Sequence, residues 1–376
     1  LAVLPSQNTM WIFNNLLEHN LGFNLGTTKS GEPLEALFMQ NNLVISNLMR
    51  LYTEVDSEAD DYPVNTIDHN VVFTQAKAAE VGLDKASAFK PARAVSALID
   101  AGVARVVVAM KDPNPLMSGQ GLERLRIQGI EVKSGVLEAA ARALNPGFIK
   151  RMELGRPRIR CKIAMSLDGR TAMASGESKW ITSTDARKDV QRLRAESSAI
   201  LTGIGTVLAD DPGLNVRDPD YAQVQRQPDR VVMDTGLQIP ATARMLALPG
   251  RTYVLTAANS DNDRHKRAVE TQGAQIIYIP INDKHLCLKH VLEQLSRLQY
   301  NDVLLEAGAT LSGAMLRAGY VDELIIFIAP HLMGSDARGL FNMPGLVNMS
   351  ERIELDFKEI MSVGRDFRIT AIPRML

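Results

Sequence analysis

Small residues follow an apolar strand near the C-terminal end of the sequence, in the run 304–313. A strand that breaks at a glycine-rich turn and continues as a helix exposes backbone N–H groups at the positive end of the helix dipole, which suits a phosphate or pyrophosphate. Glu306 stands directly after the strand, and open α/β sheets bind ligands at the carboxyl ends of their strands. The turn predicts a phosphate site with Glu306 beside it; tight packing of the helix is the alternative.

A second pair of glycines, Gly203 and Gly205, follows another predicted strand. The dinucleotide fingerprint Gly-x-Gly-x-x-Gly needs a third glycine, and Leu208 occupies its place, so the pattern does not indicate a Rossmann site. The loop that follows, residues 210–217, carries two carboxylates and Arg217. A ligand-binding loop and a solvated surface both remain open for this segment.

A third candidate begins at Ser166-Leu167-Asp168-Gly169-Arg170 and leads through a Ser/Gly-rich loop to Ser178 and Trp180. A Trp in a polar loop can cover a flat ring, and burial in the core explains it equally well. On the preceding strand, Lys162 alternates with apolar neighbours. A buried ammonium needs a partner, so we expect a function for Lys162.

The sequence gives little support for a metal site or a disulfide. His285, Cys287 and His290 form a His-x-Cys-x-x-His run, but positions 285 and 290 do not share a helical face and no second cluster accompanies them. The two cysteines, Cys161 and Cys287, make no Cys-x-x-Cys pair and no disulfide framework. We expect no metal site and two reduced thiols.

The elements that must position these residues alternate between helix and strand, which is typical of an α/β fold with parallel strands. Between 91 and 150 the pattern predicts helices over 95–101, 121–128 and 137–144 and strands over 104–110 and 130–132. A Pro- and Arg-rich connection at 151–158 is the expected domain boundary.

Beyond this connection, strands are predicted at 159–165, 199–202, 230–234, 252–256, 275–280, 302–305 and 323–329, and helices at 185–196, 264–271, 289–298 and 311–318. The segment from 203 to 227 is expected to be one long polar loop. Residues 357–372 form a final strand pair joined at Gly364, which completes a mixed sheet.

Length and charge narrow the classes of protein. A chain of 376 residues is long enough for about two domains. With 42 basic and 43 acidic residues, the net charge of −1 gives no basic field for nucleic acid. Apolar stretches such as 106–110 and 324–329 fall short of the ~20 residues that cross a bilayer, and no basic residue precedes Lys29, so we expect no membrane span, no secretory signal and a cytoplasmic location.

The first part of the chain differs in composition from the rest. Residues 1–76 hold nine acidic and two basic side chains, a net charge of −7, and the first fifty residues include eight Asn. No sustained helical or strand period is present there, so no element is assigned to it.

Several of these motifs, taken together, resemble the C-terminal reductase half of the RibD family, the bifunctional proteins of riboflavin biosynthesis. The resemblance rests on Lys162 with 166–172, the loop 176–182, Thr206 with Asp210-Asp211-Pro212, Glu306-Ala307-Gly308, and 329–334. It covers residues 155–376. It implies a dihydrofolate-reductase-like mixed sheet with flanking helices, an NADPH site without a full Rossmann fingerprint, and reduction of 5-amino-6-(5-phosphoribosylamino)uracil to the ribitylamino compound.

The resemblance also implies site residues at the matching positions. NADPH contacts fall on Ala164, Trp180, Thr206, Asp210, Thr235, Gly308, Ala309, Thr310, Leu311, Ser312 and Gly313. Substrate contacts fall on Ser178, Arg194, Leu214, Arg217 and Glu306. The guanidinium groups of Arg194 and Arg217 suit a phosphate dianion. Lys162 and Glu306 are the candidates for orienting the sugar, as an open-chain imine, and for handling its proton while the nicotinamide lies close.

The N-terminal half of that family is a zinc deaminase, which needs a His-Ala-Glu segment and two Cys ligands. Here Leu34-Glu35-Ala36 stands in that place, and no Cys precedes Cys161. Residues 96–105 and 112–115 nevertheless match the far side of the deaminase domain. We therefore expect a degenerate deaminase-like α/β domain over 1–150, unmatched over 1–92 and matching over 93–150, and a reductase domain over 155–376. Such a chain holds no zinc and cannot deaminate.

Other interpretations stay open. An out-of-frame reading of the gene would explain residues 1–90 and would make the protein a full bifunctional deaminase and reductase. A non-catalytic, nucleotide-binding scaffold is a different class. The resemblance further implies a small ribosylaminopyrimidine phosphate as the partner, and assembly into a homo-oligomer through the reductase domain.

Overall fold

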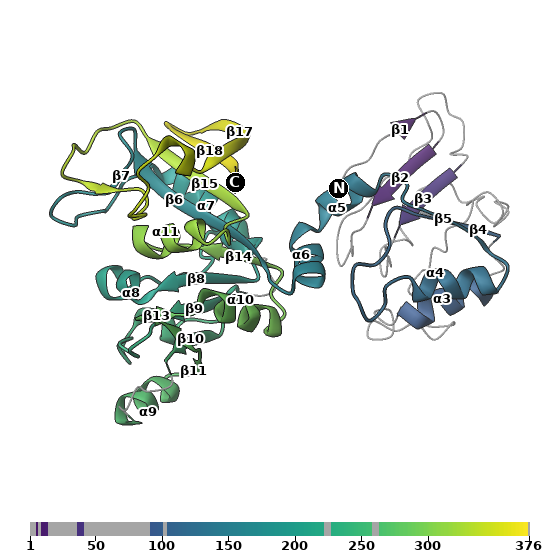
Figure 1. Cartoon of the computed structure of the whole chain (residues 1–376), viewed down its shortest axis with the longest axis horizontal. Coiled ribbons are helices and arrows are strands. Elements are labelled where there is room, and N and C mark those ends of the chain that lie inside the picture. The colour runs from purple at the N-terminus through teal and green to yellow at the C-terminus, as the bar shows by residue number, and fades with distance from the viewer. Residues whose placement is uncertain are drawn as a thin grey trace. The chain divides into compact units, whose positions relative to one another are not determined.

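The structure is a computed structural model, and it describes residues 5–6, 9–13, 36–40, 91–100, 104–221, 227–257 and 263–374. Internal contacts divide the chain into two compact units, Leu1–Glu153 and Leu154–Leu376. Figure 1 shows the helices and strands of both units with their labels. Each unit is described by itself.

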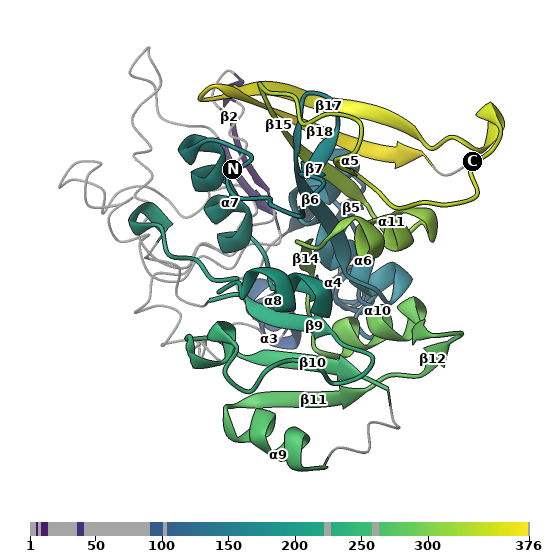
Figure 2. The ribbon, with the colours of Figure 1, turned by 90° about the vertical axis from the view of Figure 1, so that its left-hand side faces the viewer.

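A nine-stranded sheet forms the second unit, in the order β11-β10-β9-β8-β14-β6-β15-β18-β17. The strands are β6 (Arg158–Ser166), β8 (Ala199–Gly203), β9 (Asp229–Met233), β10 (Thr252–Thr256), β11 (Ala274–Tyr278), β14 (Asp302–Leu305), β15 (Glu323–Ala329), β17 (Glu354–Val363) and β18 (Asp366–Arg374). Neighbours from β11 to β15 run parallel, whereas β18 is antiparallel to both β15 and β17. The predicted mixed sheet is confirmed, and the β17–β18 hairpin forms one of its edges (Figure 2).

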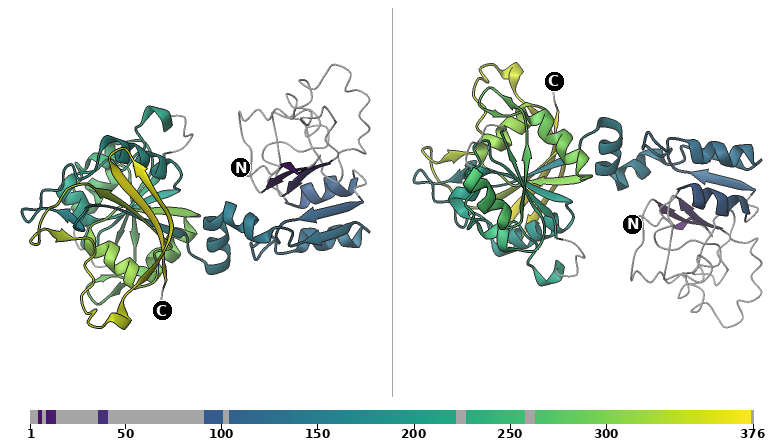
Figure 3. Two further views of the ribbon diagram at one scale, coloured as in Figure 1. Left: turned by 90° about the horizontal axis from the view of Figure 1, so that it is seen from above. Right: turned by 90° about the horizontal axis from the view of Figure 1, so that it is seen from below.

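Helices lie on both faces of this sheet (Figure 3). They are α7 (Thr184–Ala195), α8 (Ile204–Asp210), α9 (Asp263–Thr271), α10 (Leu288–Arg297) and α11 (Ala309–Arg317). Because side chains alternate along a strand, each strand contributes residues to the core on both faces of the sheet. Tyr253 and Leu255 of β10 pack with α10 and α11, while Val254 packs in the core that contains Val190 and Leu193 of α7.

Smaller elements complete the second unit. Short strand pairs are β7 (Arg170–Ala172) with β16 (Arg338–Gly339) and β12 (Ile281–Asn282) with β13 (His285–Leu286). Three 3₁₀ turns are η3 (Pro219–Tyr221), η4 (Arg244–Ala247) and η5 (Met349–Glu351).

The described part of the first unit is smaller. Its elements are β1 (Pro5–Ser6), β2 (Thr9–Phe13), β3 (Ala36–Gln40), α3 (Pro91–Asp100), β4 (Arg105–Val108), α4 (Gln120–Ile127), β5 (Glu131–Ser134), α5 (Glu138–Leu144) and α6 (Pro146–Leu154). Strands β1, β2 and β3 form one sheet, and β4 pairs parallel with β5. A buried cluster of Ala109, Met110, Ala141 and Ile149 packs the segment after β4 against α5 and α6.

Two segments differ from their predictions. The connection expected at 151–158 is helical in its first half, because α6 starts at Pro146, a favoured first helical residue, and ends before Gly155 at φ +66°. The loop expected over 203–227 contains α8, whose Val207 is buried in the core. Seven residues are too few for a helical period to stand out in the sequence. The remaining predicted helices and strands of 91–374 are present, with ends shifted by a few residues.

In the described part of the chain, no helix has the length and apolar character needed to span a bilayer.

Candidate functional site

The predicted residues gather at the carboxyl ends of three neighbouring parallel strands, β6, β14 and β8. Lys162 and Ala164 lie on the same side of β6, since they are two positions apart. Glu306 follows the last residue of β14, and its backbone N–H donates to Leu201 O on β8 at 3.0 Å. Helix α7 covers this side of the sheet through Val190 and Leu193. The sheet therefore brings Lys162 and Glu306 together beneath α7.

Arg194, in the last turn of α7, forms a bidentate ion pair with Glu306. Its Nε lies 2.6 Å from Oε1 and its Nη2 lies 2.9 Å from Oε2. The third nitrogen, Nη1, donates to Asn215 O at 3.1 Å. Both side chains are about nine-tenths buried, with 10% and 11% of their surface exposed. The fork of Arg194 is thus already used by Glu306, which bears on its predicted contact with substrate.

Electrostatics separate the roles of the two catalytic candidates. Burial lowers the pKa of Lys162 below the ordinary lysine range, and nearby Glu306 offsets part of this effect. Burial acts on Glu306 in the opposite sense, but the ion pair with Arg194 outweighs it and lowers the pKa of Glu306. Within the described residues, the Lys162 ammonium has no hydrogen bond or ion pair and lies 6.0 Å from the Phe327 ring centre. Lys162 is the group suited to exchange a proton, and Glu306 stays ionised.

Arg217 is the exposed cation of the site. Its backbone N–H donates to Gln191 Oε1 on α7 at 2.9 Å, which fixes the loop on the helix. Burial lowers the pKa of Arg217, and the positive charges of Arg194 and Arg244 lower it further. In the part of the chain that the structure describes, the Arg217 guanidinium has no hydrogen-bonding or ion-pair partner. Positive charge gathered in this way favours an anion.

Leu214 lies in the same loop but is only 3% exposed, inside the core cluster of α7. Its φ of +43° is unusual for a leucine. The structure therefore does not present the Leu214 side chain on the surface that carries Arg217.

The turn at 306–313 combines the two alternatives that the sequence left open, which are a phosphate site and tight packing of the helix. Gly308 caps α11 without a side-chain hydrogen bond, is exposed, and has open space where a Cβ would stand. Ala309, Thr310 and Leu311 form the first turn. Ser312 and Gly313 are buried, and a Cβ on Gly313 would lie 2.5 Å from Asn342 O. The start of the turn can receive a ligand, whereas its end serves packing.

The remaining residues predicted to contact cofactor lie around this edge of the sheet. Thr206 is half-buried and Asp210 exposed, both on α8, directly after β8. Thr235 follows β9, and its carbonyl accepts hydrogen bonds from Thr256 Oγ1 and Ala257 N, each at 3.2 Å. Because β8, β9 and β14 are parallel, these segments share one edge with Gly308.

Trp180 is 71% exposed, so of the two positions that the sequence left open, the core is excluded. The Arg187 guanidinium lies 4.6 Å above its ring centre, and Arg187 also donates to Thr182 O at 2.7 Å. Ser178 is half-buried in the same loop. The loop thus offers a flat aromatic face, held by a cation from α7, at the surface of the unit.

Sequence reasoning did not assign a role to Asp168, which joins two loops that are distant in the chain. Its carboxylate accepts hydrogen bonds from Ser166 Oγ, from Met333 N at 3.1 Å and from Gly334 N at 2.8 Å. The Ser166 hydrogen bond, helped by those backbone N–H groups, lowers the pKa of Asp168 to about 2. The predicted motif 166–170 is therefore fixed to 331–334, a connection that no local pattern could reveal.

Among the described residues no group of His, Cys, Asp or Glu is arranged to hold a metal ion. The segment 34–35, where the sequence lacks the His-Ala-Glu motif, lies outside the described residues. Cys161 is buried and Cys287 half-buried, and both thiols are free.

Comparison with known proteins bears on the same region. The family model described as "RibD C-terminal domain" matches residues 157–369. The chain belongs to the RibD family. The RibD of Escherichia coli K12 is 49% identical over 279 residues, which cover 72% of this chain and 74% of that protein. The RibD of Haemophilus influenzae is 42% identical, covering 74% and 75%.

Solved RibD structures resemble the fold. Acinetobacter baumannii RibD (form 1) has a TM-score of 0.66 at 42% identity and covers 75% of this chain and 76% of its own. A deaminase/reductase of Thermotoga maritima has a TM-score of 0.62 at 28% identity, covering 75% and 74%. The resemblance stated from the sequence is confirmed: this is a RibD-type riboflavin biosynthesis protein with a pyrimidine reductase function.

Proposed function

We propose that this chain reduces 5-amino-6-(5-phosphoribosylamino)uracil to the ribitylamino compound with NADPH, at the site formed by Lys162, Glu306 and Arg217. The observation that carries the proposal is the buried Arg194–Glu306 pair beside Lys162, with Glu306 at the carboxyl end of β14 and Lys162 within the neighbouring strand β6. Desolvated ionisable groups with shifted pKa values are characteristic of catalytic sites. The reductase named in the Thermotoga maritima protein acts on this same ribosylaminouracil.

The residues at the strand ends fit a dinucleotide cofactor. The open space at Gly308 and the uncapped first turn of α11, through Ala309, Thr310 and Leu311, suit a pyrophosphate, since helix N-termini bind anions. Thr206, Asp210, Thr235, Ala164 and Trp180 would complete the NADPH contacts. Ser312 and Gly313 support this turn by packing. When bound, NADPH supplies a hydride to the sugar carbon C1′.

Arg217, with Ser178, is the proposed site for the substrate phosphate. Its guanidinium is exposed and free of partners among the described residues, and its neighbours Arg194 and Arg244 add positive potential. Arg194 has a different role in this proposal, because Glu306 already occupies its fork. Arg194 holds the Glu306 carboxylate in place, and the carboxylate orients the hydroxyl groups of the open-chain sugar. Leu214 contributes through its backbone.

Lys162 is the proposed proton donor. Reduction of the open-chain imine adds a hydride to C1′ and a proton to the attached nitrogen. The Lys162 ammonium, whose pKa is lowered by burial, gives up a proton more readily than an exposed lysine. Glu306 remains ionised because of Arg194 and partly stabilises the ammonium before transfer.

The test is product analysis with the purified full chain. Incubation with NADPH and the aminouracil ribotide should give the ribitylamino product, and replacement of Arg217 by Met should raise KM for the ribotide more than it lowers kcat. Binding of NADPH without any product would instead favour the nucleotide-binding scaffold. Identical kinetics of the wild type and Arg217→Met would contradict the phosphate site.

We further propose that the chain has lost the deaminase step. The donor set for zinc is absent: Glu35 and its neighbours replace the His-Ala-Glu motif, and the only cysteines are Cys161 and Cys287. Elemental analysis of the purified protein should therefore find no stoichiometric zinc. One tightly bound zinc per chain, together with turnover of the deaminase substrate, would contradict this. Sequencing of the gene distinguishes a degenerate domain from a frame error.

The β17–β18 hairpin supports assembly with a second copy through the reductase unit. Leu355, Phe357, Ile360 and Phe367 are 37%, 61%, 57% and 52% exposed. The strand register puts them on one face with Ile369 and Ala371, while the ion pairs of Arg368 and Arg374 lie on the other. Exposed apolar side chains that extend the core-facing side of an edge hairpin are unusual for a free surface.

The size of this face fits a dimer. At 150–250 Å² per fully buried aromatic side chain, the two phenylalanines would bury on the order of 200 Å² per copy. The two aliphatic residues add to this area, which makes up part of the roughly 800 Å² per partner that a standard interface buries. Sedimentation should show an oligomer that Phe357→Ser with Phe367→Ser converts to monomers. Ile281→Ser, also at an exposed residue, should leave it intact. A monomeric wild type would contradict the proposal.

A further inference from the structure

Helix α7 carries polar and charged side chains on two opposite faces. Arg187, Gln191 and Arg194 are spaced i, i+4, i+7, and Asp189, Arg192 and Glu196 are spaced i, i+3, i+7. At 3.6 residues per turn, each set shares one side of the helix, and the two sides are opposite. Val190 and Leu193 pack in the core between them.

The first face carries the site. Arg187 stacks on Trp180, Gln191 holds the backbone of Arg217 at 2.9 Å, and Arg194 pairs with Glu306. These three contacts reach the cofactor loop, the phosphate loop and the carboxylate of the proposed reductase site. Any rotation or shift of α7 moves all three together.

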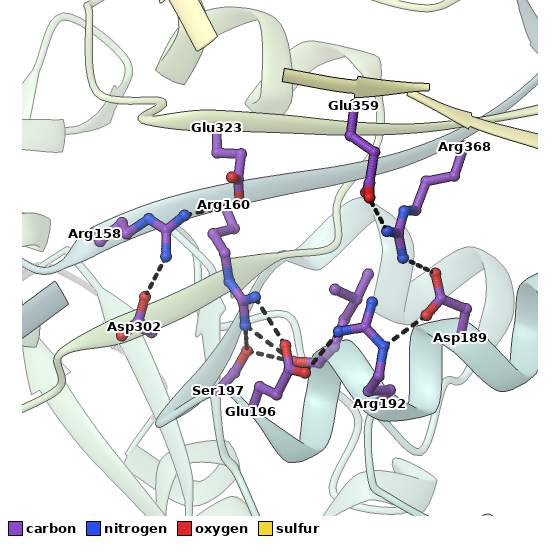
Figure 4. A network of polar contacts seen from close by, with 11 residues as sticks. Arg158, Arg160, Asp189, Arg192, Glu196, Ser197, Asp302, Glu323, Glu359 and Arg368 are labelled. Atoms are coloured by element: carbon purple, nitrogen blue, oxygen red, sulfur yellow. Dashed lines mark hydrogen bonds and ion pairs between the residues drawn. The ribbon is translucent and has the colours of Figure 1, made fainter. Parts of the chain in front are cut away.

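The opposite face is held by a chain of ion pairs, which Figure 4 shows. Arg368 of β18 lies 2.5 Å from Asp189 and 2.6 Å from Glu359 of β17. Asp189 also forms an ion pair with Arg192 at 2.8 Å, and Arg192 forms a second one with Glu196 at 2.6 Å.

On β6, Arg160 closes the chain. It lies 3.2 Å from Glu196 and donates to Leu193 O at 3.2 Å and Ser197 Oγ at 2.9 Å, at the negative end of α7. The chain therefore joins α7 to three strands of the sheet, β6, β17 and β18.

The hairpin turn fixes the other end of the helix. Asp366 is fully buried, and its Oδ2 accepts the Ser183 N–H at 2.7 Å, directly at the N-cap of α7. Gly364, at φ +60°, packs so closely on Asp185 that a Cβ there would overlap the carboxylate. The hairpin thus contacts α7 at its start and at its middle.

Burial makes these contacts strong determinants of position. The side chains of Arg368 and Asp189 are 12% and 14% exposed. Loss of one partner leaves a poorly hydrated charge with fewer contacts, and a movement of the helix toward water relieves it. An exposed ion pair at the far end of the same strand, Arg374–Asp356, has no such constraint, since its side chains are 61% and 36% exposed.

We propose that Asp189 and Arg368 are positioning residues for the reductase reaction, acting through α7 on Glu306 and Arg217. This inference rests on the proposed function. A displacement of about 1 Å at a reacting group can reduce turnover by roughly a hundredfold, so small movements of α7 have measurable effects.

The test compares Arg368→Met and Asp189→Asn with the matched control Arg374→Met, in the full chain. Arg368→Met should lower kcat/KM for the ribotide about tenfold or more, with an increase in KM for the ribotide. The dissociation constant of NADPH should change less than the KM for the ribotide, because α7 touches the proposed cofactor site at Trp180 while the turn of α11 lies outside the chain of ion pairs. Arg374→Met should stay within twofold of wild type, and Arg368→Lys should recover part of the loss.

Each outcome decides the inference. A merely structural role would reduce the folded fraction while KM and the kcat per folded molecule stay at wild-type values, and that result overturns the proposal. Equal kinetics of Arg368→Met and Arg374→Met also overturn it. If Arg368→Met does not fold, Asp189→Asn and Arg368→Lys supply the same comparison. A wild type without ribotide turnover would refute the proposed function itself, which is a separate result.

Discussion

The reductase unit has buried ion pairs beside exposed ones such as Arg374–Asp356, whereas the Arg142–Glu153 and Arg105–Glu131 pairs of the first unit are exposed. In the reductase unit Arg194 and Glu306 are about nine-tenths buried, and Arg368 and Asp189 nearly as much. In the described part of the first unit, Arg142 and Glu153 are 38% and 40% exposed, and the pair Arg105–Glu131 is more exposed still. Exposed pairs contribute little and buried ones are costly to break. The difference marks the reductase unit as the place where charge is held in fixed geometry.

The cores differ in the same direction. Two large clusters fill both faces of the nine-stranded sheet, whereas the described part of the first unit has the small cluster around Ala109 and Met110. The family model also matches within the reductase unit, over residues 157–369. Paired substitutions, one in each unit or two within the reductase unit, therefore test this difference.

The largest expected effect is loss of catalysis in Lys162→Met. Removal of a general acid typically costs a factor of about 10² to 10⁴ in rate. The wild-type kcat/KM should fall as pH rises through the lowered pKa of Lys162, because the ammonium is lost, and this limb should be absent from the variant. Lys133→Met, at an exposed lysine of β5, should have wild-type activity. A pH–rate profile measures both, and an active Lys162→Met would exclude the proton-donor role.

The next effect is on stability. Arg194→Met leaves the Glu306 carboxylate buried without its partner and should lower the free energy of unfolding by about 3–5 kcal/mol. Arg142→Met removes an exposed pair in the first unit and should cost no more than ~1 kcal/mol. Urea unfolding, followed by a spectroscopic signal from each unit, gives the free energy of unfolding of both variants. Similar losses in the two variants would contradict the contrast in depth.

Two glycines in the turn of α11 should behave differently. Gly313→Ala puts a Cβ 2.5 Å from Asn342 O and should destabilise the unit by about 1–3 kcal/mol. Gly308→Ala meets open space and should change stability by less than ~1 kcal/mol while weakening NADPH binding. Thermal unfolding with a fluorescence titration of NADPH separates them. Unchanged NADPH affinity in Gly308→Ala would remove this turn from the proposed cofactor site.

The smallest effect concerns Asp168 and acid. Its folded-state pKa of about 2 lies below that of an unfolded aspartate, so its contribution to stability is present above pH ~4 and is lost as pH falls toward 2. Asp168→Asn should have a lower Tm than wild type at neutral pH, and the two should converge near pH 2. A difference in Tm that is independent of pH would show that the charge is not responsible.

Local patterns in the sequence predicted most of the reductase fold. Strands such as β10, β14 and β15 are buried apolar runs bounded by turns, and their predicted bounds agree with the structure. Helix α8 was missed because seven residues are shorter than two helical periods. Strands β1, β2 and β3 were also not predicted, since this part of the sequence shows no sustained alternation of apolar and polar residues.

The sequence indicated several residues that the structure brings close together, but not the contacts between them. The glycine turn and Glu306 follow a strand end that the sequence shows, and Lys162 lies within another predicted strand. Contacts between residues far apart in the chain leave no local trace: Arg194 meets Glu306 across 112 residues, and Asp168 meets Gly334 across 166. In the proposed site, the pairing with Glu306 gives Arg194 the role of a support for that carboxylate in place of the predicted contact with substrate.

The most direct test is a single-turnover experiment with the full chain, NADPH and the aminouracil ribotide. Absorbance of the reduced nicotinamide is followed after mixing. We expect one equivalent of NADPH to be oxidised for each equivalent of ribitylamino product, with the rate strongly reduced in Lys162→Met. A folded chain that binds NADPH but leaves its absorbance unchanged in the presence of the ribotide would contradict the proposed reductase function.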